Sequence, residues 1–284
     1  MGTRSAGRNK NHIGIIILLI LLAAAGVCAL FLFPGRDKVK RTAHISLDDA
    51  NEIFLDIYRE KYDSIFDNAV LGKLKYLHET YGITVDLYVF GELDEFEMWD
   101  MPVSYREEFC ENAEWLKIGY HSITEENPAL DGRTFEAFQE EYARIDSAIR
   151  RFAGGESVAH VLRLHYWYAT KEMVAYLKEQ GVTGLLCSDR GGPSYDLDEK
   201  QAEKLYKSRD GRLKEEDITY YATDIRLEDV RDIEAALEEH RKDRIIVIFT
   251  HAWCFAENYD KLETAIRWLW QEGYQFSNLE SMAR

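Results

Sequence analysis

The spacing of apolar residues changes repeatedly between residue 42 and the C-terminus. Short apolar runs alternate with longer segments in which apolar residues recur at helical intervals. The short runs predict strands at 43–47, 83–90, 115–120, 160–164, 183–187, 218–222, 245–249 and 274–276. The longer segments predict helices at 70–81, 103–112, 135–152, 171–180, 227–241 and 258–272.

This alternation gives seven or eight β/α units. Nearly continuous apolar strands are typical of parallel sheets that helices cover on both faces. The sequence therefore predicts an α/β fold, a distorted TIM-like (β/α) barrel of seven or eight units, over residues 42–284. An open doubly wound sheet is the alternative.

The N-terminal region differs from the rest of the chain. Residues 13–33 form a run of 21 residues without a charge. At ~1.5 Å per residue, a helix of this length spans roughly 30 Å, the thickness of bilayer hydrocarbon. We expect a tail at 1–12, a transmembrane anchor at 13–33 and a linker at 34–41. A cleaved signal peptide is the alternative, although its apolar region usually runs only about 7–15 residues.

The orientation of this anchor follows from domain size. Basic residues flank both ends of the run, so the positive-inside rule does not decide it. A short tail before a large domain favours a tail inside the cell and a domain outside. The chain is therefore predicted to be a single-pass membrane protein with its barrel on the extracytoplasmic side.

Charge separates the two regions further. Residues 1–44 contain seven bases and one acid, whereas residues 45–284 contain 28 bases and 50 acids, a net charge of −22. Such an acidic domain argues against nucleic-acid binding. The four cysteines are far apart and show no CxxC spacing, which argues against a zinc ribbon or a disulfide framework.

Polar residues collect where the predicted strands end. The active site of a (β/α) barrel lies at the carboxyl ends of its strands. Most predicted strands are followed there by an ionisable residue, and aromatic residues lie close by. In chain order these residues are Asp48, Asp49, His121, Glu125, Arg163, His165, Tyr166, Trp167, Asp189, Asp224, His251 and Trp253.

These residue types suit metal-assisted hydrolysis. Asp49, His121 and Glu125 offer oxygen and nitrogen ligands for a divalent ion such as zinc. Three protein ligands leave a position for water, whose proton Asp48 would accept. Arg163 would orient Asp48 through a charge-assisted pair, and His251 would protonate the leaving group.

Each residue also has an ordinary structural interpretation. Asp49 could cap the helix that follows it, His121 could be a hydrogen-bonded structural residue, and Arg163 could form a plain ion pair. Glu125 lies in the acidic stretch TEENP, and the aromatic residues could pack in the core. It is the placement of all of them at strand ends that favours a site.

Four short motifs appear in order along the chain. They are SLDDA from Ser46, HSITE from His121, RLHY from Arg163 and IFTH ending at His251. In this order they resemble the motifs TFDDG, H-[ST]-x-x-H, R-x-P-[YF] and Leu-x-His of the polysaccharide deacetylase family, the NodB-homology enzymes of carbohydrate esterase family 4. The similarity covers most of residues 42–284.

The resemblance implies a role for each residue. Asp48 would be the base, Asp49 and His121 metal ligands, and His251 the acid, with Arg163 beside Asp48. Asp189 is the first choice for the acid of the fourth motif and Asp224 the second. Glu125 replaces the second motif histidine, and His165 replaces the motif proline, so either could complete the metal site.

The resemblance also implies a function. Together with the predicted anchor, it indicates a membrane-anchored deacetylase that uses a divalent metal, zinc by preference, on an acetylated cell-envelope glycan. Tyr166, Trp167 and Trp253 would bind this substrate. Two alternatives remain: an inactive barrel that binds glycan or a partner protein, and a carbon–nitrogen hydrolase with a non-sugar substrate.

Overall fold

The computed structural model describes residues 41–129 and 132–283. The chain divides into two compact units, Met1–Lys40 and Arg41–Arg284, and all that follows concerns the second. The predicted tail, anchor and most of the linker therefore lie outside the described residues. Within the described part, no helix combines the length and apolar character needed to cross a membrane.

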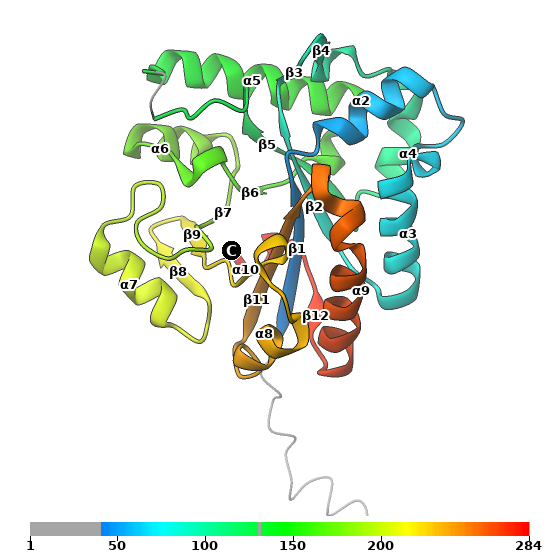
Figure 1. Ribbon diagram of the computed structural model, residues 1–284. Coiled ribbons are helices and arrows are strands. Elements are labelled where there is room, and N and C mark those ends of the chain that lie inside the picture. The colour runs from blue at the N-terminus through cyan, green and yellow to red at the C-terminus, as the bar shows by residue number, and fades with distance from the viewer. Residues whose placement is uncertain (1–40, 130–131, 284) are drawn as a thin grey trace, which may run out of the picture. The chain divides into compact units, whose positions relative to one another are not determined.

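Parallel strands form the centre of the domain (Figure 1). The larger sheet has the order β10-β11-β1-β2-β5, with β12 pairing to the start of β1. The second sheet has the order β6-β7-β9-β8, in which only β8 is antiparallel.

The strands of these two sheets are β1 (Thr42–Asp48), β2 (Val85–Phe90), β5 (Leu116–Ser122), β6 (Val161–Leu162), β7 (Gly184–Leu186), β8 (Arg212–Glu215), β9 (Ile218–Tyr221), β10 (Ile225–Arg226), β11 (Ile245–His251) and β12 (Gln275–Phe276). A small hairpin, β3 (Glu92–Leu93) and β4 (Phe96–Glu97), follows β2.

The predicted α/β class with parallel strands is confirmed, but the described strands do not form one continuous ring. Between β5 and β6 the sheets are joined by a single bridge, Ile118 to Val158. At the other end β8 occupies the free edge of β9, where a closing strand would have to pair. The antiparallel strand β8 was not predicted, since its sequence RLKE has no apolar run.

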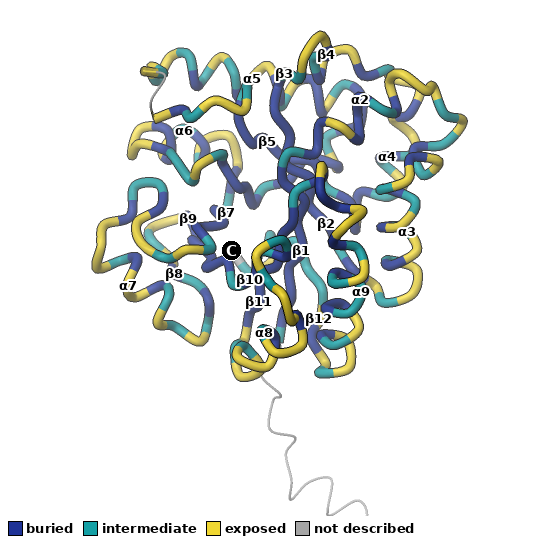
Figure 2. The backbone as a smooth tube through the Cα atoms, viewed as in Figure 1, coloured by how far each residue is buried: buried dark blue, intermediate teal, exposed yellow. Residues whose placement is uncertain are grey.

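Helices surround the strands. In Figure 1, α3 and α9 lie on one side of the larger sheet, α5 runs along its top, and α6 and α7 accompany the second sheet. The helices are α2 (Asn51–Glu60), α3 (Ala69–Tyr81), α4 (Arg106–Glu111), α5 (Phe135–Phe152), α6 (Lys171–Glu179), α7 (Glu199–Lys207), α8 (Ile233–Glu239), α9 (Phe255–Gln271) and α10 (Glu280–Ala283). Figure 2 shows the central strands β1, β2, β7, β9 and β11 almost wholly buried, with many exposed residues on the helices.

Local signals explain most helix boundaries. The side chains of Thr134 and Thr170 accept hydrogen bonds from the first turns of α5 and α6, as the sequence predicted. The predicted helix at 227–241 is wrong in its first turns. A short 3₁₀ helix occupies Leu227–Asp229, and α8 begins only after Asp232, whose side chain caps it.

The first strand has one apolar and one polar face. Its alternation separates three apolar residues from Thr42, His44, Ser46 and Asp48, and all seven are buried. Ser46 and Asp48 both contact Arg163, which follows β6. The polar face of β1 is therefore turned towards the second sheet, and Asp48 lies at its carboxyl end.

Candidate active site and metal centre

Asp49 leaves the end of β1 in an unusual conformation. Its φ of 53° lies in the left-handed region, which Asp tolerates better than most residues. Ala50, not Asp49, is the N-cap of α2, and no side chain caps that helix, so the helix-cap interpretation of Asp49 is wrong. The Asp49 carboxylate points instead to His121, with Oδ1 3.4 Å from Nε2. This Oδ1 is buried and makes no hydrogen bond.

Two histidines are held in defined tautomers by backbone carbonyls. His121 Nδ1 lies 2.5 Å from the carbonyl oxygen of Arg163, and His165 Nε2 lies 2.9 Å from that of Glu125. A carbonyl can only accept, so each of these nitrogens carries the proton. The lone pairs remain on His121 Nε2 and His165 Nδ1.

These two lone pairs face each other at 3.1 Å. Two acceptors at this distance repel unless a proton or a cation lies between them. Burial lowers the pKa of His165 to about 4, which disfavours the proton at neutral pH. The arrangement therefore fits a metal cation.

The third donor atom comes from Asp49. Its carboxylate oxygen, His121 Nε2 and His165 Nδ1 all lie within 4.8 Å of one another. One oxygen and two imidazole nitrogens form a donor set suited to zinc or a similar divalent ion. Burial alone would raise the pKa of Asp49, but interactions with the surrounding histidines outweigh it and lower that pKa, so the carboxylate is ionised and available.

Glu125 does not belong to this group. His121 and Glu125 would share one face only in a helix, and the chain bends after β5 instead. The Glu125 residue is exposed, and it contributes its backbone carbonyl to His165. Of the two residues that the sequence offered as third ligand, the structure brings only His165 to the other two.

Asp48 is paired with Arg163 in the interior. Arg163 Nε lies 3.2 Å from Asp48 Oδ1, and both side chains are almost fully buried. Arg163 also donates to Thr223 Oγ1 at 2.9 Å and lies over the ring of Phe249. Burial raises the pKa of Asp48, while the guanidinium of Arg163 is the largest influence that opposes this rise. The carboxylate is thus held in one orientation beside the histidines.

His251 has an acidic partner that the sequence did not reveal. Its Nδ1 is hydrogen-bonded to Glu228 Oε1, and the same oxygen accepts from the His251 backbone at 3.2 Å. Burial lowers the pKa of His251, but the bond to Glu228 outweighs it and leaves the pKa raised. His251 Nε2 lies 3.8 Å from Asp49 Oδ2. The proton-bearing imidazole therefore lies beside the metal donors.

Neither acid expected for this role partners His251 or Arg163 among the described residues. Asp224 accepts from the backbone of Val247 at 2.7 Å and lies 3.6 Å from His240. Asp189 follows β7 in the next loop, and its Oδ1 is buried without a hydrogen bond. Glu228 was missed because it fell inside the helix predicted at 227–241. Its only signal was an acid two residues after the short strand β10, which the sequence did not predict.

A cavity of about 260 Å³ opens beside these groups. Tyr166 and Trp167 line it and have φ values of 53° and 51°, a strained conformation that functional sites often retain. Trp253 does not line it. Its indole donates to Asp49 Oδ2 at 3.3 Å, and its ring stacks on His251. The lining residues are Asp48, His121, Arg163, Leu164, His165, Tyr166, Trp167, Arg190, Arg226, Phe249 and His251.

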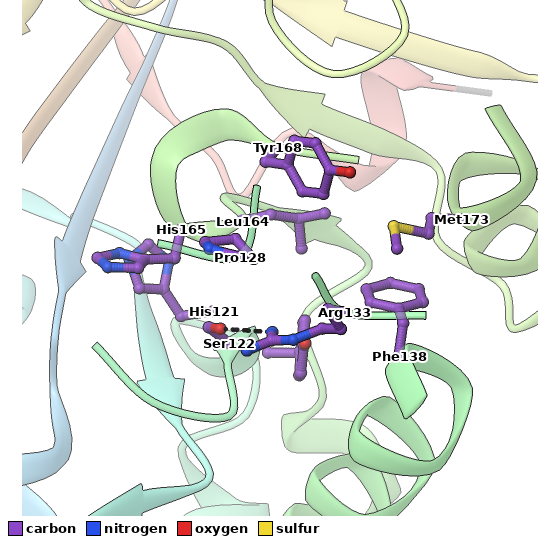
Figure 3. A pocket seen from close by; sticks show the side chains of 10 residues that line it. His121, Ser122, Pro128, Arg133, Phe138, Leu164, His165, Tyr168 and Met173 are labelled. Atoms are coloured by element: carbon purple, nitrogen blue, oxygen red, sulfur yellow. Dashed lines mark hydrogen bonds between the residues drawn. The ribbon is translucent and has the colours of Figure 1, made fainter. Parts of the chain in front are cut away.

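Apolar side chains cover the other side of the two histidines. Figure 3 shows His121 and His165 close together at one end of a smaller pocket, with Phe138 and Met173 at the opposite end. Arg133 donates to Ser122 Oγ at 3.0 Å and so ties down the residue next to His121. These side chains surround the pocket that the two imidazole rings help to line.

Comparison with known proteins gives similarity in structure but not in sequence. A scan against family models and a search of curated proteins find no match. A solved structure of a protein assigned as a polysaccharide deacetylase from Mycobacterium smegmatis matches with a TM-score of 0.53 and 13% identity, covering 86% of this chain and 89% of that one. A 4-alpha-glucanotransferase from Thermococcus litoralis matches with a TM-score of 0.56 and 15% identity, over 86% of this chain and 40% of that one. A Streptococcus mutans CE4 esterase matches with a TM-score of 0.48 and 11% identity, over 84% and 85%.

The two matches with a TM-score above 0.5 show which fold the chain has. The chain has the α/β fold of the Mycobacterium smegmatis protein over nearly the whole length of both chains, so the expected similarity to polysaccharide deacetylases is confirmed in structure. The glucanotransferase has a different activity on a similar fold. A shared fold does not fix a reaction, so the reaction must be argued from the site.

Proposed function

We propose that this chain is a metal-dependent hydrolase that removes acetyl groups from an acetylated glycan of the cell envelope. The proposal rests on the imidazole lone pairs of His121 and His165, which face each other at 3.1 Å. Beside them lies Asp49 Oδ1, which is buried and makes no hydrogen bond. A base and an acid, each with its own orienting partner, flank this group.

Each residue then has one task. A divalent ion, with zinc well suited, held by Asp49, His121 and His165 would supply Lewis-acid polarisation of water and of the acyl carbonyl. Asp48 accepts the proton of the attacking water, while Arg163 keeps its carboxylate in place.

The acid completes the reaction. His251 donates its Nε2 proton to the nitrogen or oxygen that leaves, and Glu228 holds the opposite Nδ1–H. The carbon–nitrogen or carbon–oxygen bond breaks, water supplies the new hydroxyl group, and the products are acetate and a free amine or alcohol. Water and the acetylated substrate are the only reactants that this hydrolysis consumes.

The cavity supports a sugar as the substrate. Tyr166 and Trp167 offer aromatic faces at its lining, where the apolar face of a sugar ring can pack. The alternative, an inactive barrel that only binds glycan or a partner, is favoured by the departures from the family motifs at Glu125 and His165. The intact pairs Asp48–Arg163 and His251–Glu228 favour the enzyme.

The proposal includes the location of the protein. We place residues 13–33 in the membrane as a single uncleaved span, with the domain of residues 42–284 on the extracytoplasmic side. This placement agrees with a substrate in the cell envelope, and it depends on the sequence of residues 1–41 alone.

Acetate release tests the proposal. The full chain, purified in detergent and loaded with zinc, should release acetate from N-acetylated hexosamine oligomers or O-acetylated glycans. Asp48→Asn should reduce the rate by about 10²–10⁴-fold, because the general base is lost, while bound metal remains. A zinc-loaded wild-type protein that releases no acetate from either class of substrate would overturn the assignment.

A further inference from the structure

Two arginines in the cavity have no task in the reaction described above. Arg190 lies in the loop after β7, and Arg226 is the last residue of β10, yet both line the same cavity of about 260 Å³ as Asp48 and His251. The third arginine there, Arg163, is already paired with Asp48. Arg190 and Arg226 therefore bring two additional positive charges next to the reacting groups.

The loop that carries Arg190 is anchored at several points. The Arg190 backbone donates to Ser188 Oγ at 3.1 Å, and the Ser188 backbone donates to Ser194 Oγ at 3.0 Å. Tyr195 then donates its backbone N–H to the carbonyl of Trp167 at 2.7 Å, so the loop is tied to the segment that lines the cavity. Arg190 itself is exposed. Within residues 41–129 and 132–283, no acidic side chain forms an ion pair with it.

Arg226 also retains hydrogen-bonding capacity. Its Nε is buried and makes no hydrogen bond. The nearest carboxylates, those of Glu228 and Asp229, lie 3.7 and 3.9 Å from it, too far for a hydrogen bond. Glu228 is moreover engaged by His251. The indole N–H of Trp167, another lining residue, is likewise buried without a partner.

This local charge runs against that of the domain. Residues 45–284 carry a net charge of −22, and several of their arginines are paired with acids, for example Arg144 with Glu92 and Glu97. Arg190 has no acidic partner among the described residues, and Arg226 has only the long ion pairs with Glu228 and Asp229, at 3.7 and 3.9 Å. A bound anion would give both guanidinium groups a closer partner. Planar guanidinium groups suit the oxygens of carboxylate and phosphate in particular.

We propose that the cavity binds a sugar that carries an anionic group, a carboxylate or a phosphate, through Arg190 and Arg226. The identification of the ligand as a sugar substrate rests on the proposed function. The anionic group would lie beside the sugar being deacetylated and would select acidic glycans over neutral ones.

Binding of sugars without acetyl groups tests this separately from catalysis. Calorimetry with the zinc-loaded full chain in detergent would compare three probes: a glucose tetramer, the same tetramer with one glucuronic acid, and the same tetramer with one glucose 6-phosphate. None of these probes carries an acetyl group, so this experiment measures binding alone. A failure of the proposed deacetylase activity would show in the acetate-release assay and not here. We expect at least one anionic tetramer to bind about tenfold or more tightly than the neutral one. The better of the two identifies the anion as carboxylate or phosphate.

A matched pair of variants identifies the contact. Arg190→Gln should remove most of the preference for the anion, about tenfold. Arg209→Gln should leave it unchanged, because Arg209 is also exposed but lies outside the cavity lining. Equal binding of all three probes would overturn the proposal. A preference for the anion that survives Arg190→Gln would also overturn it, because the metal alone would then hold the anion. A preference that Arg190→Gln and Arg209→Gln reduce equally would overturn it as well.

Discussion

His165 shows how single residues determine this site. The resembled motifs have a proline at its position and a histidine at that of Glu125, so the chain has lost one imidazole and gained another. The two changes are linked in space, since the backbone carbonyl of Glu125 holds His165 Nε2 at 2.9 Å. The result is one carboxylate and two imidazoles around a common point.

Glu228 gives a test of the acid through pH dependence. Its hydrogen bond opposes the effect of burial and raises the pKa of His251. Glu228→Gln removes the negative charge, so the pKa of His251 should fall, and less of the acid form remains as the pH rises. The high-pH limb of the rate of acetate release should therefore move to lower pH.

The neighbouring acid is the control for this experiment. Asp229 is mostly exposed and lies near Arg226 rather than His251. Asp229→Asn should therefore leave the high-pH limb in place. If the limb stays unchanged in Glu228→Gln, or moves equally in both variants, then Glu228 does not set the pKa of the acid.

At the scale of elements, the sequence predicted the strands better than the loops between them. Short apolar runs predicted strands that end just before Asp48 and His251, and the structure has these two residues as the last of β1 and β11. Side chains in loops depend on turns that have no period. For that reason Glu125 was considered as a ligand and Glu228 was missed. The edge strand β8 was missed because it has no apolar run.

The junction of β10 and β11 has its own pH dependence. Burial raises the pKa of Asp224 to about 7, although the nearby His240 opposes the rise. The folded state thus favours the protonated, neutral form of Asp224. The stability that this protonation contributes is complete below the unfolded pKa near 3.8 and is lost as the pH rises through the folded pKa of about 7.

Asp224→Asn imitates the neutral acid at every pH. The amide oxygen can still accept from the Val247 backbone. The free energy of unfolding of the variant, relative to wild type, should therefore increase between pH 4 and pH 8, by up to about 4 kcal/mol. Urea titrations at several pH values measure this difference. A difference that stays constant with pH would show that Asp224 is ionised at little cost.

At the scale of the whole molecule, the α/β class was accessible from the sequence, but the closure of the sheet and the reaction were not. The apolar strands require helices on both faces, which fixes the class. Ring closure depends on which edges pair, and the edge of β9 is taken by β8. The fold is shared with a glucanotransferase, so only the site residues distinguish one activity from another.

The predicted anchor concerns the whole molecule too. Because residues 13–33 are long and apolar enough to span a bilayer, the full chain should sediment with membranes. A chain that starts at Lys40 should remain in the soluble fraction. Fractionation followed by N-terminal sequencing measures both. A mature N-terminus beyond residue 26 would indicate cleavage and contradict an uncleaved anchor.

Metal content tests the central claim most directly. The purified wild-type chain, saturated with zinc and then desalted, should retain one ion per chain by mass spectrometry of the element. His165→Ala should lose most of it, because one of three ligands is gone. Glu125→Ala should retain it, since its backbone carbonyl still holds His165. Loss of zinc in Glu125→Ala with retention in His165→Ala would contradict the site described above.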